Sequence, residues 1–357
     1  MFKVADYLIQ AQSSVILEGF AELRPLDTRG GSSAICSIWI LGLALTRLVR
    51  GRIDSRLAGV HVNMAERLSL VRKAVVVVVS RALGLPVVLH LHAAQLHHIY
   101  RALPRPLQTL IRWIFSLPSV CIVLGTTGRR FVTQELNVSP EKVAIVINGV
   151  PAPTVPRRRA EQSDIQRILF LGNLSERKGV SDLLRALAFP EFARDGLEVT
   201  IAGGGDVEGY REQAQCLGID SFTNFAGWVD QAEAAYLLAN ADVLILPSYD
   251  EGLPLVILEA LANGVAVVCT AVGEIPSVLT DGVDVCFVEP GDVSSIAEGL
   301  RRVLSSPTLR EALERNGRML FERQFSLSGF FNNVADIHQK AFGTSGRLNE
   351  SASASQR

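Results

Sequence analysis

Two glutamates, Glu251 and Glu259, could place carboxylates beside one end of a buried strand. An apolar run over residues 243–246 precedes them, and a second run over residues 265–268 follows. Short runs rich in Val, Ile and Leu, bounded by Pro and Gly, are typical of buried parallel strands. The segment between the runs is predicted to be a helix, because Pro254 suits its first turn. The stretch therefore predicts one βαβ unit.

The loop before this helix is suited to a phosphate and a sugar. Ligands of α/β sheets bind at the carboxyl ends of the strands, where this loop would lie. The amides of Gly252, Leu253 and Leu255 would point out of the helix start, where an anion is favoured. A carboxylate beside them accepts strong hydrogen bonds from sugar or ribose hydroxyls. The alternative is an exposed loop glutamate and a glutamate on the solvent side of the helix.

A second strand end carries residues suited to a phosphate. The predicted strand at 168–171 is followed by G-N-L-S-E-R-K-G, which ends at Gly179. Gly172 lets the backbone approach a phosphate, and the ammonium group of Lys178 is a mobile point charge. Alone, this spacing is a weak indication of a ligand.

Two further strand ends are candidates for nucleotide contacts. The strand predicted at 199–202 runs into Gly203 and Gly204, where a nucleotide could approach the backbone. A tight turn without a ligand is the alternative. A short strand is predicted at 225–229, with Val229 at its end.

Histidines gather at the end of the strand predicted for residues 86–91. Alternation places His90 and His92 on one face of that strand, and His97 and His98 follow. Imidazoles can ligate zinc, but no carboxylate or thiol completes a ligand set. We therefore interpret His90 as a structural histidine. His92, at the strand end, is in a position that faces ligands.

The composition predicts a globular protein with two domains. The chain has 357 residues, of which 48% are hydrophobic and 20% charged. Its five cysteines, at positions 36, 121, 216, 269 and 286, form no C-x-x-C pair. Scattered cysteines indicate a reducing compartment and argue against structural zinc. The apolar run near residues 35–45 is too short to span a bilayer, which takes about 20 residues.

The near-neutral net charge hides an asymmetry. Residues 1–160 hold 20 Lys and Arg against 8 Asp and Glu, whereas residues 161–357 hold 15 against 28. A basic half can bind nucleic acid, an anionic membrane surface or an anionic substrate. We exclude nucleic acid, since no recognised motif is present and few aromatics lie among the arginines. Dispersed, solvated arginines are the alternative interpretation.

Two of the helices predicted in the basic half have a second interpretation. Residues 34–50 are apolar nearly all round, and we interpret them as a buried core helix. The alternative is a helix with one face in a membrane interface. Residues 66–83 include five consecutive valines, which favour a strand. We nevertheless predict a helix there, because parallel strands need a crossover between them.

Glu251-Gly252-Leu253-Pro254 together with Glu259 resembles the E-x7-E motif of retaining glycosyltransferases of family 4. The A-L-A-N-G-V-A-V-V that follows also matches, as does the N-G-V at residues 148–150. The resemblance implies the GT-B fold, with two doubly wound, Rossmann-like α/β domains facing a central cleft. Nothing before residue 30 fits the family's first strand and Gly-rich loop. We expect either that this element is missing or that translation starts upstream.

The resemblance implies how a diphosphate leaving group is neutralised. Lys178 matches the lysine of the family's G-R-x-x-x-x-K-G segment, whereas Asn173 stands where arginine is usual. Arg177 could compensate, but a neighbouring residue usually points elsewhere. The sequence contains no D-x-D, so we expect no metal and no cofactor apart from the sugar donor.

The resemblance also implies the remaining site residues. Glu251 would lie beside the donor sugar, and Glu259 would bond the ribose hydroxyls. His92 would be the contribution of the first domain. The expected catalytic residues are therefore His92, Lys178 and Glu251. The expected nucleotide contacts are Gly172, Asn173, Lys178, Gly203, Gly204, Val229, Gly252, Leu253, Leu255 and Glu259.

The expected organisation follows from these assignments: an acceptor domain at 1–151, a nucleotide-sugar domain at 152–330, a returning helix at 331–343 and a disordered tail at 344–357. Residues 151–164, rich in Pro and Arg, are interpreted as the linker between the domains. Further elements are predicted as strands at 20–26 and 57–62 and as helices at 104–116, 231–240 and 327–342, the last of which contains most of the returning segment. The expected partners are a UDP- or GDP-sugar, a glycan or lipid-linked acceptor, and an anionic membrane surface. This places the chain in the cytoplasm, on the inner membrane face, in surface polysaccharide or glycolipid synthesis. The alternatives are a nucleotide-sugar epimerase on the same fold and a non-catalytic scaffold.

Overall fold

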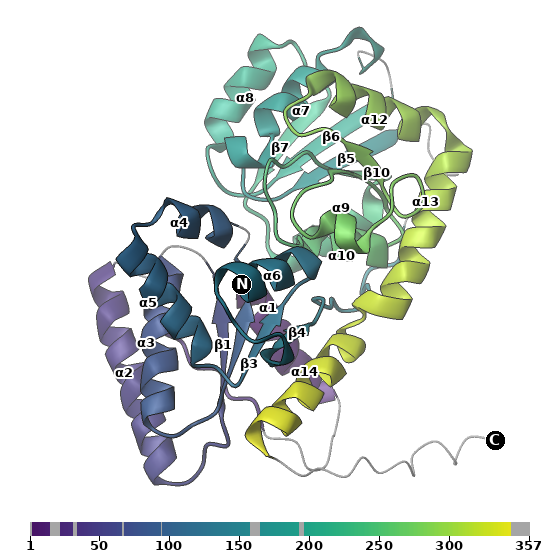
Figure 1. Cartoon of the computed structure of the whole chain (residues 1–357). Coiled ribbons are helices and arrows are strands. Elements are labelled where there is room, and N and C mark those ends of the chain that lie inside the picture. The colour runs from purple at the N-terminus through teal and green to yellow at the C-terminus, as the bar shows by residue number, and fades with distance from the viewer. Residues whose placement is uncertain are drawn as a thin grey trace, which may run out of the picture. The chain divides into compact units, whose positions relative to one another are not determined.

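A computed structural model describes residues 2–14, 22–30, 34–65, 68–93, 95–157, 165–192 and 196–343. The chain divides into two compact units (Figure 1). Unit 1 consists of Met1–Asn148 with Leu327–Arg357, and unit 2 of Gly149–Ser326. The predicted tail from residue 344 lies outside the described residues.

Unit 1 is built on a four-stranded parallel sheet in the order β1-β2-β3-β4 (Figure 1). Its strands are β1 (Val60–Met64), β2 (Val87–Leu91), β3 (Val120–Val123) and β4 (Val143–Ile145). Its helices are α1 (Phe2–Ser14), α2 (Ala34–Ile53), α3 (Leu68–Ala82), α4 (Leu96–Ala102), α5 (Arg105–Ser116), α6 (Thr126–Arg130) and α14 (Leu327–Phe342). Short turns of helix, η1 (Phe131–Glu135) and η2 (Pro140–Lys142), precede β4.

Helices cover both faces of the central strand β2, which is buried along its whole length. Leu89 lies in the same hydrophobic cluster as Val76 and Val77 of α3. The side chain of His90 points to the opposite face, where its ring contacts that of Phe330 in α14. The crossover helix predicted over the valine run is therefore confirmed, and tertiary packing overrides the strand propensity of those valines.

Helix α2 corrects the prediction of a buried core helix. Its inner side packs through Ala44 and Leu48, but Ile38 is 72% exposed and Trp39 is 70% exposed. A helix that is apolar all round is normally buried. Here α2 lies beside α3 on the outside of unit 1, so one apolar side stays uncovered (Figure 1).

Unit 2 is built on a six-stranded parallel sheet in the order β10-β9-β8-β5-β6-β7. Its strands are β5 (Gln166–Leu171), β6 (Leu197–Ala202), β7 (Thr223–Gly227), β8 (Val243–Leu246), β9 (Ala266–Thr270) and β10 (Cys286–Val288). Its helices are η4 (Glu176–Lys178), α7 (Val180–Leu187), η5 (Pro190–Phe192), α8 (Val207–Cys216), α9 (Gln231–Asn240), α10 (Leu255–Ala262), α11 (Ile275–Val278), α12 (Val293–Ser305), α13 (Pro307–Leu320) and η6 (Phe321–Phe325).

The strand order of unit 2 reverses between β5 and β8. From β5 the chain adds β6 and then β7 on one side, and β8, β9 and β10 on the other. In an open α/β sheet, the carboxyl ends of the strands at such a reversal diverge and leave a ligand crevice. The loops after β5 and β8 hold Lys178 and Glu251, so both residues lie at the edge of the sheet where such a crevice forms.

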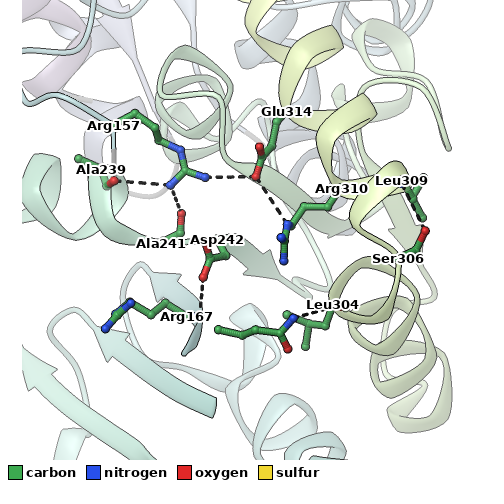
Figure 2. Close-up of polar contacts among 11 residues, drawn as sticks. Arg157, Arg167, Ala239, Ala241, Asp242, Leu304, Ser306, Leu309, Arg310 and Glu314 are labelled. Carbon is green, nitrogen blue, oxygen red and sulfur yellow. Dashed lines mark hydrogen bonds and ion pairs between the residues drawn. The ribbon is translucent and has the colours of Figure 1, made fainter. Parts of the chain in front are cut away.

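The start of unit 2 is fixed by Arg157, which lies in the segment predicted to be a linker (Figure 2). Its guanidinium donates to the carbonyls of Ala239 and Ala241, and Nη2 lies 3.2 Å from Glu314 Oε1. Arg310 lies 3.9 Å from the same carboxylate. Burial nevertheless raises the pKa of Glu314. Residues 158–164 of the predicted linker lie outside the described part of the chain.

Several predicted boundaries shift by a few residues. The strand predicted at 57–62 is β1 at Val60–Met64, and the one predicted at 225–229 is β7 at Thr223–Gly227. A strand predicted at 20–26 is wrong as far as residues 22–26 are described, since these form no regular element. The helices predicted at 231–240 and 327–342 are confirmed at both ends as α9 and α14.

Candidate functional site

Three charged side chains meet after β5 and β8 in unit 2. The Glu251 side chain is 8% exposed, and its Oε1 accepts a hydrogen bond from Nζ of Lys178, which is 12% exposed. Nη1 of Arg177 lies 3.9 Å from Glu251 Oε2 and donates to the Asp250 carbonyl at 2.5 Å. The structure thus brings together Lys178 and Glu251, two of the residues singled out from the sequence. It adds Arg177, whose side chain was expected to point away from the position of Lys178.

Backbone contacts hold the β5 and β8 loops against each other. The short helix η4 carries Arg177 and Lys178, and the amide of Tyr249 donates to the Arg177 carbonyl at 2.9 Å. Gly179 follows with φ 69°, and a Cβ there would lie 2.1 Å from the Pro247 carbonyl oxygen. Only glycine permits both this conformation and this approach. The two cations therefore reach Glu251 because the loops are fastened at Tyr249 and Gly179.

The loop after β6 joins this arrangement. The Leu174 amide donates to the Gly204 carbonyl at 2.7 Å. A Cβ on Gly203, whose φ is 148°, would lie 1.7 Å from the Gly172 carbonyl oxygen. Gly172, Gly203 and Gly204 are thus neighbours, and Gly203 is required by the packing of one loop on another. Val229, also expected at the site, lies two residues beyond the end of β7.

Glu259 lies in α10, which follows Pro254 at its N-cap position. The residue is 9% exposed, and Glu251 is 7% exposed, so neither glutamate is the solvent-facing residue of the alternative interpretation. Of the three amides expected at a phosphate, that of Leu255 belongs to the first residue of α10 and has no intrahelical acceptor, whereas Gly252 and Leu253 lie in the loop before Pro254. The start of α10 supplies partial positive charge close to the Glu251 loop.

A fourth loop, after β9, supports the Glu251 segment. The Glu274 amide donates to the Gly252 carbonyl at 2.9 Å. Gly273 has φ 62°, and a Cβ there would lie 1.9 Å from the Glu251 carbonyl oxygen. Glu274 itself is 6% exposed. Together with Glu251 and Glu259, it is the third buried glutamate in this part of unit 2.

His92 lies in unit 1, directly after β2, where its amide donates to the Met64 carbonyl at 2.8 Å. Its Nε2 lies 2.8 Å from Asn63 Oδ1, and its ring lies against that of His90, with 4.0 Å between centroids. With Asn63 as acceptor, Nε2 carries the proton and Nδ1 is the acceptor nitrogen. Desolvation lowers the pKa of His92 to about 3, so the imidazole is neutral at pH 7.

Two further histidines complete this group in unit 1. Nδ1 of His61 lies 2.7 Å from Nε2 of His338 in α14. Both ring nitrogens of the fully buried His90 lack a hydrogen-bond partner. Desolvation lowers the pKa values of His61, His90 and His338, the last to about 4. Across the described part of the chain, no group of three or more His, Cys, Asp or Glu side chains is arranged to hold a metal ion.

Comparison with known proteins gives one family match. Residues 153–319 match the family model described as "Glycosyl transferases group 1". An uncharacterized glycosyltransferase of Methanocaldococcus jannaschii is 30% identical over 240 residues, which are 63% of this chain and 61% of that protein. The MMP alpha-(1->4)-mannosyltransferase of Mycolicibacterium hassiacum is 30% identical over 229 residues, 63% of this chain and 55% of that protein. The chain thus spans less than two thirds of the length of these relatives.

Solved structures resemble both units. The sucrose-phosphate synthase of Thermosynechococcus elongatus has a TM-score of 0.72 at 18% identity, over 92% of this chain and 83% of that one. Anabaena HepE in complex with UDP-glucose has a TM-score of 0.69 at 16% identity, over 88% of this chain and 86% of that one. These likenesses confirm the predicted α/β GT-B fold.

Proposed function

We propose that this chain, which matches the group 1 glycosyltransferases over residues 153–319, moves a sugar from a nucleotide-sugar donor to an acceptor, with retention of anomeric configuration. The observation that carries the proposal is the meeting of Lys178 and Glu251 where the strand order of unit 2 reverses. A lysine, a helix start and close-packed glycine loops at one strand edge are suited to a sugar bound through a diphosphate.

The proposed chemistry depends on stabilising the leaving group. The bond between the anomeric carbon and the β-phosphate oxygen breaks, a bond to the acceptor hydroxyl oxygen forms, and the proton of that hydroxyl passes to the departing diphosphate or to solvent. Negative charge grows on the departing diphosphate. Lys178 and the amides at the start of α10 would meet this charge with donors already in position. Such fixed donors in a low-dielectric site are often the largest contribution to catalysis.

The nucleotide is assigned to the same face of unit 2. We assign the ribose hydroxyls to Glu259, because a buried carboxylate gains most from hydrogen bonds with hydroxyls. The base is assigned to the loops that carry Gly203, Gly204 and Val229. Glu251 is assigned to the donor sugar, and His92, a neutral imidazole, is retained as the catalytic contribution of unit 1.

The donor that we propose is a UDP-sugar, with a GDP-sugar as the second candidate. The likeness to a structure that holds UDP-glucose supports this choice. The proposed acceptor is a glycan or a lipid-linked sugar, in surface polysaccharide or glycolipid synthesis on the cytoplasmic side of the membrane. No described helix is both long enough and apolar enough to cross a bilayer.

A surface of unit 1 supports a lipid-linked acceptor. Helices α2, α3 and α5 lie side by side (Figure 1). They expose large apolar side chains, namely Ile38, Trp39, Leu43, Val49, Ile53, Leu68, Val71, Val75, Leu107, Leu110 and Trp113. The same helices carry eight Lys and Arg and no Asp or Glu. We propose that this α2–α3–α5 surface rests on an anionic membrane, because apolar and basic groups together suit that interface.

A ligand screen tests the function directly. The purified chain is heated with UDP-, GDP- and ADP-sugars, and a donor that binds the folded state raises Tm by mass action. The donor that raises Tm is then incubated with candidate acceptors, and products are analysed by mass spectrometry and NMR. An α- or β-glycoside with the donor's configuration supports retaining transfer. If the free nucleotide-sugar isomerises without acceptor, the chain is an epimerase. If it binds none of the donors, the proposal is wrong.

A further inference from the structure

Asn173 leaves the proposed phosphate site one cation short. The side chain of Asn173 is exposed and uncharged, and it stands where the resembling family has arginine. Lys178 is already paired with Glu251. A lysine and a glutamate in contact sum to no net charge, so this pair alone offers a diphosphate little attraction.

Arg177 restores the charge balance. With its guanidinium at 3.9 Å from the Glu251 carboxylate, the group of Arg177, Lys178 and Glu251 carries a net charge of +1. The Arg177 side chain is 43% exposed, whereas Lys178 and Glu251 are nearly buried. Arg177 therefore forms the solvent side of the group, from which an anion would arrive.

The position of Arg177 has a backbone cause. Neighbouring side chains of a short helix diverge, so Arg177 and Lys178 would not normally meet one carboxylate. Here the Tyr249 amide donates to the Arg177 carbonyl, which holds residue 177 beside the Asp250–Glu251 segment. The long arginine side chain then reaches the Asp250 carbonyl and Glu251.

The guanidinium retains donors for a ligand. Both contacts of Arg177 are made by Nη1. A guanidinium has five N–H donors in a planar fork that matches a phosphate bidentately. Nε and Nη2 are thus the nitrogens that can donate to two oxygens of a diphosphate.

We propose that Arg177 is the second diphosphate-binding cation of this chain and takes over the task of the arginine that Asn173 replaces. The inference rests on the proposed function, since it assigns a residue to that same site. It makes Arg177 a binding residue that acts on the phosphates and not on the base or ribose.

The test compares binding of UDP with binding of uridine, by calorimetry and by NMR titration. Arg177→Ala is expected to weaken the binding of UDP about tenfold, because a charge-assisted hydrogen bond is lost. The affinity for uridine should not change. The salt dependence of UDP binding should fall as well. Arg177→Lys keeps the charge without the planar fork of donors, so its loss of UDP affinity should be smaller than that of Arg177→Ala. Adding Asn173→Arg to Arg177→Ala should recover most of the affinity.

Arg301→Ala is the matched control. Arg301 is also half-exposed and forms an ion pair with Glu298 of its own helix, α12, which carries none of the proposed site residues, so its loss should leave the binding of both ligands unaffected. Equal UDP affinity in wild type and Arg177→Ala overturns the inference while the proposed function stands. So does an equal loss for UDP and uridine, which indicates a structural role. If wild type binds no UDP, GDP or ADP, both proposals fall.

Discussion

Replacing Lys178 with alanine is the sharpest test of the proposed chemistry. The substitution removes the ammonium group that donates a hydrogen bond to Glu251. If this ammonium stabilises the departing diphosphate, its loss should raise the barrier by roughly 2–4 kcal/mol, as for removal of one oxyanion donor. At about 1.4 kcal/mol per factor of ten, kcat then falls by roughly 30- to 700-fold.

The same substitution has a separate cost in stability, which must be subtracted. Breaking a buried ion pair costs about 3–5 kcal/mol when the remaining charge has no partner. Glu251 keeps Arg177 at 3.9 Å, so we expect a smaller loss, about 1–3 kcal/mol. For a domain of this size, each kcal/mol lowers Tm by roughly 2–4 °C. The variant should therefore still fold at 25 °C.

The assay follows release of the nucleoside diphosphate from saturating donor, beside a thermal melt of each variant. Lys178→Ala combined with Glu251→Gln serves as the control, because it removes the charge that the first substitution strands. The double variant should recover Tm, and its rate is compared with that of Glu251→Gln alone, because Glu251 is itself assigned to the donor sugar. A folded Lys178→Ala protein with kcat within threefold of wild type would refute the leaving-group role.

Three other predictions follow from the structure. Glu259→Ala should weaken nucleotide binding more than it lowers kcat at saturation; wild-type affinity in calorimetry would contradict the ribose assignment. Trp39→Ser with Trp113→Ser should reduce cosedimentation with anionic liposomes at low salt, while neutral liposomes bind wild type weakly; unchanged cosedimentation would exclude the α2–α3–α5 surface. The pKa of His338 is lowered from 6.5 to about 4, so the unfolded state binds more protons. The contribution of His338 to the free energy of unfolding is therefore at its maximum above about pH 6.5 and should fall towards pH 4, by up to roughly 3 kcal/mol. His338→Phe should show a shallower dependence of this free energy on pH.

The strand and helix pattern of this chain could be predicted because local signals agreed with the tertiary structure. Helix α9 begins at the predicted residue, since Asp230 and Glu233 form a capping box there. The buried strands β8 and β9 are continuous apolar runs, as parallel strands covered on both faces should be. The helix at the valine run followed from connectivity, which outweighed propensity.

Side-chain environments that depend on distant segments could not be predicted. Periodicity identified α2 as apolar, but it does not say whether another layer covers the outer side of Trp39. His61 meets His338 across 277 residues of sequence, and no local pattern links them. Arg177 is placed by a hydrogen bond from Tyr249, so its direction is a property of two loops and not of its own neighbours.

Glu251 also keeps its two partner cations in place when no ligand is bound. Arg177 and Lys178 are adjacent in sequence, and without an anion between them their repulsion would drive the side chains apart into water. The buried carboxylate of Glu251 attracts both side chains and offsets the repulsion between them. Under the proposed function, an arriving diphosphate competes with Glu251 for donors that are already oriented, so little side-chain ordering is needed on binding. The carboxylate thereby lowers affinity for the free nucleotide somewhat, but it preserves the geometry on which stabilisation of the leaving group depends.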